Sequence, residues 1–183
     1  MKRDLTGILM CGGKSSRMGQ DKYALLFNGK PLYSASLQML ESLCTSIIVS
    51  SNKTYPEFSN YTVLRDEVMD IGPIGGLYTC LKNSKATYNM VIACDMPLVD
   101  GTTMCMLLEH LEGRHDVIVP QYKGQLQPLY AIYMSSIIPI IEQCIASKRY
   151  SLQLLLSMSD VCVVNVAESC TEFKNVNLQE DLC

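Results

Sequence analysis

Residues 5–22 read LTGILMCGGKSSRMGQDK, and the interpretation of the whole chain starts from this stretch. The apolar run at residues 8–11 is typical of a buried strand, and it stops at Gly12 and Gly13. Two adjacent glycines let the backbone turn with positive φ and let a ligand approach bare N–H groups. Backbone amides together with cations are what a polyphosphate requires. Three cations follow among small residues: Lys14, Arg17 and Lys22.

The familiar phosphate-binding patterns do not fit this loop. A Walker A loop that ends in Gly13-Lys14-Ser15 requires glycine at position 8, where the chain has Ile8. The Rossmann fingerprint requires a third glycine at position 16, where the chain has Ser16. An ordinary strand-to-loop turn with solvated charges stays an alternative, because glycine-rich turns are common. If residues 12–22 bind phosphate, they form a phosphate-binding loop of a class other than Walker A and Rossmann.

Length and composition indicate one globular domain that spans residues 1–183. Of its residues 48% are apolar and 18% are charged, and the net charge of −3 disfavours general binding of nucleic acid. No stretch approaches the roughly 20 apolar residues of a membrane helix. The nine cysteines are odd in number and none has CxxC spacing, which disfavours a zinc site or a disulfide framework. We therefore expect a cytoplasmic protein that binds neither nucleic acid nor membrane.

Short apolar runs alternate with amphipathic segments along the chain. The pattern predicts strands at residues 8–11, 46–50, 61–65, 88–94, 116–120, 127–133 and 161–164. It predicts one helix that begins at Pro31 and another that ends near residue 83. It also predicts helices over residues 102–111, 135–147 and 151–157, with a terminal helical turn at 178–182. This alternation is typical of an α/β fold of three layers, a mostly parallel sheet with helices on both faces.

Ligands of such sheets bind at the carboxyl ends of the strands. Five polar or glycine residues are predicted at this edge: Gly12, Gly13, Ser50, Asp66 and Asp95. Asp95 follows the most apolar strand, and Pro97 stiffens the turn after it. A carboxylate that faces a phosphate loop is placed to hold magnesium, which uses one or two carboxylates together with phosphate oxygens. The alternative is that Asp95 only caps the next turn, but Asp100 is better placed to cap the helix that follows.

Several segments in the same order resemble a known family. The chain resembles the MobA-like nucleotidyltransferases, which carry a Gly-Gly-x-Ser-x-Arg-Met-Gly-x-Asp-Lys loop, and within them most closely the molybdenum cofactor guanylyltransferases. The resemblance spans nearly the whole chain. It rests on residues 12–22, 72–77 (GPIGGL), 94–97 (CDMP), 127–131 (QPLYA) and 173–182 (FKNVNLQEDL).

The resemblance implies a Rossmann-like nucleotidyltransferase fold and an enzyme that transfers GMP from GTP to molybdopterin that carries molybdenum, with release of pyrophosphate. It implies as partners GTP, the molybdopterin cofactor, and other proteins that make or accept this cofactor. Met10, Cys11 and Gly12 would bind the base and ribose through their backbone, although the family commonly has Leu-Ala where this chain has Met10 and Cys11. Asp66 would lie beside the nucleotide.

The resemblance also assigns the charged groups of the reaction. Lys22 would contact the triphosphate, and Lys22 and Arg17 would neutralise the charge on the pyrophosphate. Asp95 would ligate Mg²⁺ beside them. Asn175 and Asn177 match family positions near the pterin or the metal.

One departure keeps other functions open. The family commonly has asparagine where this chain has Ser50, so the selectivity for the base is an open question, with Asn52 as a possible replacement. One alternative is a related enzyme that uses CTP, or one that acts on a sugar or alcohol phosphate. A second alternative is a carrier that holds the pterin cofactor without catalysis. A carrier does not need a site for a metal and a triphosphate, which Asp95, Lys22 and Arg17 predict here.

Overall fold

The computed structural model describes residues 3–12 and 25–173, and a twisted sheet forms its centre. Within these residues the sheet has eight strands. They are β1 (Arg3–Met10), β4 (Cys44–Ser50), β5 (Thr62–Leu64), β6 (Tyr88–Ala93), β7 (Val117–Tyr122), β8 (Gln125–Leu126), β9 (Tyr130–Met134) and β10 (Val161–Asn165).

The sheet is mostly parallel, as the sequence predicts. Its order is β10-β7-β9-β6-β1-β4-β5, with β8 paired to β7. The central strand β1 is parallel to both of its neighbours, β4 and β6, and these strands are apolar on both faces. Among the strands of this order, β9 alone runs antiparallel to both of its neighbours, β6 and β7. The reason is the tight turn at Lys123 and Gly124, where both residues have positive φ, because so short a connection returns the chain in the opposite direction.

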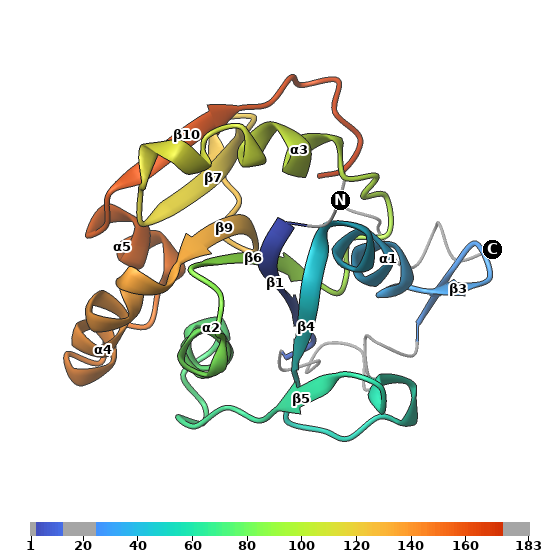
Figure 1. Cartoon of the computed structure of the whole chain (residues 1–183), viewed down its shortest axis with the longest axis horizontal. Helices are drawn as coiled ribbons and strands as arrows, with labels where there is room; N and C mark the ends of the chain where they lie inside the picture. Colours follow the sequence, from blue (N-terminus) through green and yellow to red (C-terminus); the bar gives the residue numbers. More distant parts are fainter. Residues whose placement is uncertain (1–2, 13–24, 174–183) are drawn as a thin grey trace.

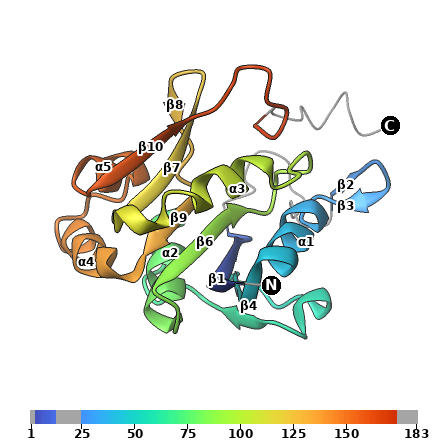
Figure 2. The same ribbon diagram turned by 45° about the horizontal axis from the view of Figure 1, so that its top comes forward.

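Helices cover both faces of the sheet, which confirms the predicted three layers. In Figure 1, α2 (Pro73–Asn83), α4 (Ile138–Ala146) and α5 (Leu152–Ser157) lie on one side of the strands. Figure 2 shows α1 (Ser34–Leu43) and α3 (Thr102–Leu108) together over the other side. Short 3₁₀ helices complete the described part: η2 (Pro56–Phe58), η3 (Leu111–Gly113) and η4 (Ser135–Ile137).

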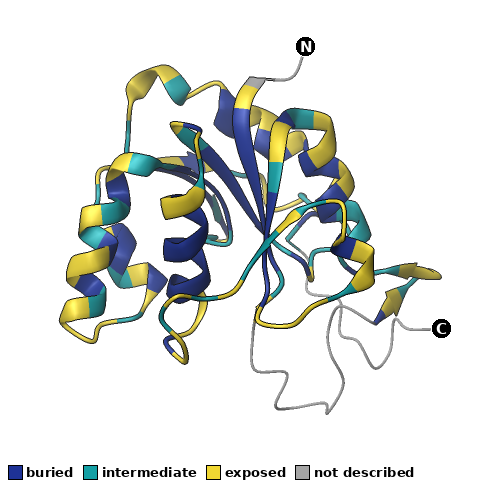
Figure 3. Cartoon of the chain, turned by 60° about the horizontal axis from the view of Figure 1, so that its bottom comes forward, coloured by how far each residue is buried: buried dark blue, intermediate teal, exposed yellow. Residues whose placement is uncertain are grey.

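Alternating side chains of the strands build one core on each face. Ile8 packs in the core beneath α2, α4 and α5, whereas Leu9 packs in the core beneath α1 and α3. Both side chains are completely buried. Figure 3 shows the same division, with buried strands between helices whose outer faces are exposed.

The prediction that Pro31 opens a helix is wrong. Pro31 lies in a two-stranded hairpin of β2 (Leu26–Phe27) and β3 (Lys30–Pro31), and α1 begins only at Ser34. The predicted Asn-Gly turn explains the error. Asn28 and Gly29 both adopt positive φ, 49° and 73°, and so pair Pro31 with Leu26 before a helix can begin.

Other element boundaries differ by a few residues. The strand predicted at 127–133 begins at Tyr130, because Tyr130 N–H donates to the Gln127 carbonyl in a turn. The helix predicted at 135–147 starts as the 3₁₀ segment η4 before it becomes α4. The turn predicted at 178–182 lies outside the described residues. In the described part of the chain, no helix has the length and apolar character needed to cross a bilayer.

Candidate active site

Four parallel strands end at one level, and the predicted site residues follow these ends. Met10 of β1 pairs with Ser50 of β4 on one side and with Ala93 of β6 on the other, and Ser50 pairs with Leu64 of β5. The ladder continues for one residue beyond Met10. Cys11 N–H donates to the Ser50 carbonyl (2.9 Å), and the N–H of residue 94 donates to the Met10 carbonyl (3.1 Å). The predicted site residues that the structure describes therefore share one edge of the sheet.

Some backbone groups at the end of β1 are already hydrogen-bonded to the neighbouring strands. The Met10 carbonyl oxygen and the Cys11 N–H already take part in sheet bonds, although a carbonyl oxygen has a second lone pair. An ideal Cβ at Gly12 would meet no atom of the described residues within 4 Å. None of the described residues thus fills the position beside the Gly12 backbone, and the assigned roles of these three residues stay predictions.

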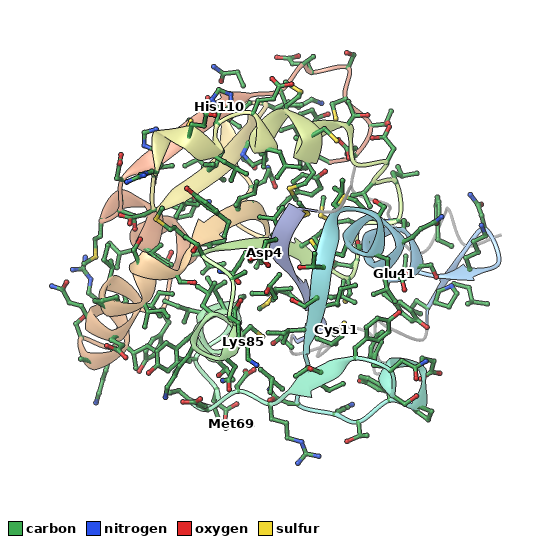
Figure 4. All side chains as sticks on the ribbon, viewed as in Figure 1. Asp4, Cys11, Glu41, Met69, Lys85 and His110 are labelled. Carbon is green, nitrogen blue, oxygen red and sulfur yellow. The ribbon has the colours of Figure 1, made fainter. Side chains whose placement is uncertain are left out.

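The Cys11 side chain is a neutral thiol. A hydrogen bond with Cys94 and then burial raise the pKa of Cys11 far above its ordinary value, and the nearby charge of Asp95 adds to this shift. Figure 4 labels Cys11 just after the carboxyl end of β1, and Asp4 near the other end of this strand. Cys11 therefore adds no negative charge at the edge where a triphosphate is predicted to bind.

The first turn of α2 packs directly against Ser50 and Asp66. A Cβ at Gly76 would clash with Ser50 Oγ and would lie 3.2 Å from Asp66 Oδ1. A Cβ at Gly75 would lie 2.6 Å from the Val68 carbonyl oxygen. The two glycines thus let the N-terminal end of this helix approach the Asp66 carboxylate, and that end of a helix favours negative charge.

Ser50 and Asn52 differ in what they offer to a ligand. The Ser50 side chain is 1% exposed and bonds to the Cys80 thiol, whose burial raises its pKa to about 12. Asn52 is exposed and pairs with Asp66 twice. Its Nδ2 donates to Asp66 Oδ2 (3.1 Å), and Asp66 N–H donates to its Oδ1 (2.9 Å). The structure therefore presents the Asn52 amide beside Asp66, whereas a direct contact from Ser50 to a nucleotide stays a prediction.

Asp95 follows a strand end that is held from three directions. Besides the ladder bond to β1, the Ala93 carbonyl accepts from Ser36 Oγ of α1 (2.9 Å), and Ala93 N–H donates to the Leu129 carbonyl (2.9 Å). Ser36 is completely buried, and its role could not be read from the sequence, because many serines in helices face solvent. Asp95 itself is exposed. A rigid strand end thus carries an accessible carboxylate.

The donor set at this edge fits magnesium better than a metal held by protein alone. Among the described residues no group of three or more His, Cys, Asp or Glu side chains is placed to hold a metal. Structural zinc requires four such ligands, whereas magnesium is usually bound through one or two carboxylates plus phosphate oxygens and water. One accessible carboxylate, Asp95, matches the second pattern.

Five predicted site residues lie outside the residues that the structure describes: Gly13, Arg17, Lys22, Asn175 and Asn177. Their assigned roles stay predictions. In the sequence, Gly13 follows Gly12 and Asn175 follows Phe173 by two residues.

Comparison with known proteins identifies the family of the chain. A family model described as the MobA-like NTP transferase domain matches residues 7–161. A protein of Flavobacterium johnsoniae named "Probable molybdenum cofactor guanylyltransferase" is 31% identical over 180 residues, which covers 97% of this chain and 94% of the relative. A Bacillus subtilis protein of the same name is 31% identical over 182 residues, which covers 95% of this chain and 90% of the relative.

A solved structure has a similar fold. The crystal structure of molybdopterin-guanine dinucleotide biosynthesis protein A from Archaeoglobus fulgidus superimposes with a TM-score of 0.81. It covers 97% of this chain and 94% of that protein at 21% sequence identity. At this identity the likeness concerns the fold alone, and it agrees with the three layers and the sheet described above.

Proposed function

The chain belongs to the MobA-like NTP transferase family, and from this membership we propose that it transfers GMP from GTP to molybdopterin that carries molybdenum. The products are molybdopterin guanine dinucleotide and pyrophosphate. The observation that carries the proposal is the similarity to named guanylyltransferases over nearly the full length of both chains. We expect the product to pass to other proteins that make or accept this cofactor.

The reaction needs no nucleophile from the protein. A phosphate oxygen of the pterin attacks the α-phosphorus of GTP in line and forms a new P–O bond. The bond from the α-phosphorus to the oxygen that bridges to the β-phosphorus breaks, and pyrophosphate leaves with that electron pair. The protein contributes positioning and electrostatic stabilisation, as in other phosphoryl transfers.

The residues at the carboxyl edge have separate tasks in this proposal. Met10, Cys11 and Gly12 bind the base and ribose through their backbone, and Asp66 lies beside the nucleotide with its carboxylate oriented by Asn52. Gly13 offers its N–H to the phosphates. Lys22 and Arg17 neutralise the charge that develops on the pyrophosphate.

Asp95 would hold Mg²⁺ at the triphosphate, and Asn175 and Asn177 would contact the acceptor. When bound, the metal supplies positive charge that stabilises the leaving group and orients the phosphate oxygens. The accessible carboxylate on a rigid strand end supports this role for Asp95.

Measurement of pyrophosphate release tests the proposal directly. The protein is incubated with magnesium, molybdenum-loaded molybdopterin, and either GTP or CTP. We expect release with GTP and a pterin product that contains guanine. A preference for CTP would instead indicate the cytidylyltransferase alternative, and binding of the pterin without any pyrophosphate would indicate a carrier.

Ligand-induced stabilisation is an independent check of the nucleotide. A ligand that binds only the folded state raises the melting temperature with its occupancy. We expect the largest rise with GTP together with magnesium. An equal rise with all four triphosphates would contradict the guanine specificity.

A further inference from the structure

Cys11 and Cys94 form a pair of thiols at the carboxyl ends of two neighbouring strands. β1 and β6 are parallel, and Met10 is paired with Ala93, so Cys11 and Cys94 are the next pair in the same register. The backbone continues this register, because Cys94 N–H donates to the Met10 carbonyl (3.1 Å). Neighbouring strands lie about 4.8 Å apart, which falls within the Cα separations that a disulfide bond spans.

The two side chains also lie on the same face of the sheet. Cys94 belongs to the core beneath α1 and α3, and Cys11 packs against this core. A hydrogen bond joins the two thiols, and it is the largest cause of the raised pKa of Cys11. Both cysteines are free in the structure. The register, the shared core and the hydrogen bond thus agree that the two sulfur atoms are neighbours.

The two thiols differ in how far solvent reaches them. Cys11 is partly exposed, whereas Cys94 is only 7% exposed. A small reagent therefore reaches Cys11 first, and Cys94 is held beside the sulfur that has reacted. The raised pKa of Cys11 leaves little thiolate, so this first step is slow. Cys11 is for the same reason a poor leaving group, so a disulfide of this pair also reopens slowly.

We propose that Cys11 and Cys94 are a redox-modification site, which a low-molecular-weight disulfide converts reversibly into an intramolecular disulfide. In the first step the Cys11 sulfur attacks one sulfur of the small disulfide, whose S–S bond breaks and releases one small thiol. In the second step the Cys94 sulfur attacks the Cys11 sulfur, and the second small thiol leaves. The two cysteines lose two electrons, which the small disulfide gains, and their two protons end on the two released thiols.

The new bond changes the candidate active site, and this consequence rests on the proposed function. A disulfide bond is about 2.05 Å long. Hydrogen bonds between sulfur atoms elsewhere in this protein measure 3.8 and 3.9 Å, so the covalent bond draws the ends of β1 and β6 together. Gly12 and Asp95 follow the two cysteines directly, and the proposed function assigns them to the nucleotide and to magnesium. A shift of about 1 Å in a site can lower the rate by about 100-fold, so we expect the oxidised chain to be less active.

Peptide mapping tests for the bond without reference to activity. The full chain is incubated with oxidised glutathione, its remaining thiols are alkylated, and it is cleaved with trypsin. We expect a cross-link between the peptide of residues 4–14, which contains Cys11, and the peptide of residues 86–114, which contains Cys94. Incubation with excess dithiothreitol before alkylation should remove the cross-link.

Cysteine variants assign the cross-link to the pair. Cys105 lies in the same peptide as Cys94 but is exposed on α3, so Cys105→Ser is the matched control and should keep the cross-link. Cys94→Ser should abolish it, and Cys94→Ala replaces this variant if the serine chain does not fold. A wild-type chain without the cross-link, a cross-link that persists without Cys94, or one that joins Cys11 to Cys80 would overturn the inference.

Pyrophosphate release measures the consequence for the site. Oxidised and reduced samples of the wild type and of Cys105→Ser are compared at the same concentrations of magnesium and substrates. In both chains kcat/KM should fall by about tenfold to 100-fold in proportion to the cross-linked fraction, and dithiothreitol should restore it. Full activity of the cross-linked chain would overturn the effect on the site. A reduced wild-type chain that releases no pyrophosphate would instead remove the proposed function, while the peptide map would still decide whether the bond forms.

Discussion

Asp95 combines exposure with a rigid base, and at the scale of single residues this combination matters most. Its neighbour Cys94 is buried, and the end of β6 is bonded to β1, to α1 and to the chain before β9. The backbone position of the carboxylate is thus held on three sides while the side chain stays accessible. The fixed backbone places the carboxylate at a defined point of this edge, which favours binding of a cation there.

Asp95→Asn should lower kcat/KM for GMP transfer by about 100-fold, because the neutral amide binds a divalent cation poorly. The concentration of magnesium for half-maximal activity should rise as well. The free energy of unfolding should change by about 1 kcal/mol or less, since the side chain is exposed.

Asp4→Asn is the matched control for this substitution. Asp4 is also an exposed aspartate, but it lies at the opposite end of β1. Its replacement should leave kcat/KM and the magnesium dependence unchanged. Equal effects of the two substitutions would remove Asp95 from the site.

The start of α2 decides how closely an element approaches the site. Pro73 and Gly72 begin this helix, and Gly72 has a φ of 76° that favours glycine. Two residues later, Gly75 and Gly76 leave no room for side chains against the loop and the Ser50 hydroxyl. The glycines therefore allow the contact between this helix and the end of β4.

Gly75→Ala should lower the free energy of unfolding by about 1–3 kcal/mol, despite the higher helix propensity of alanine. The new Cβ would lie 2.6 Å from the Val68 carbonyl oxygen, and a backbone oxygen cannot rotate away. Urea unfolding measures the effect. Gly12→Ala, where an added Cβ meets nothing among the described residues, is the control for stability. Equal stability of the two variants would contradict the tight packing of α2.

At the scale of the whole molecule, buried tyrosines make the free energy of unfolding depend on pH in the alkaline range. Burial raises the pKa of Tyr133, and burial together with the Glu172 carboxylate raises the pKa of Tyr130. A hydrogen bond to Glu41 raises the pKa of the more exposed Tyr61 to about 12. These tyrosines stay protonated in the folded chain at a pH where the unfolded chain, with pKa values of about 10, already ionises.

The free energy of unfolding should therefore fall as the pH rises above about 10. The native pKa values are raised, so the stabilisation is complete below the unfolded pKa and is lost towards the native values. Each buried tyrosine contributes a slope of about 1.4 kcal/mol per pH unit. Urea unfolding at a series of alkaline pH values measures this slope.

Tyr133→Phe should reduce that slope by the contribution of one buried tyrosine. The loss of its hydrogen bond to the Pro128 carbonyl (2.8 Å) also lowers the free energy of unfolding at neutral pH. A slope that is the same in wild type and Tyr133→Phe would contradict the assignment.

Local patterns were sufficient for much of the fold. Ile8 and Leu9 lie in opposite cores because neighbouring residues of a strand point to opposite faces, and this property belongs to the sequence itself. The predicted strand ends at Ser50 and near Asp95 were also correct within one residue. Pro31 was misassigned because proline suits both a first helical turn and a short edge strand, and the Asn-Gly turn before it decided in favour of the strand.

By itself, the sequence determined the class of fold, the edge where Met10, Ser50 and Asp95 meet, and the family resemblance. Only the tertiary structure decided that Asn52 bonds to Asp66, that Ser50 is buried against α2, and that the Glu172 carboxylate is buried and hydrogen-bonded. The physical reason is the separation along the chain over which each kind of interaction acts. Hydrophobic periodicity and turn chemistry act over a few neighbouring residues. Glu172, in contrast, accepts hydrogen bonds from Asp100 and Tyr130, which lie 72 and 42 residues away in the chain and meet it only once the strands have taken their order in the sheet.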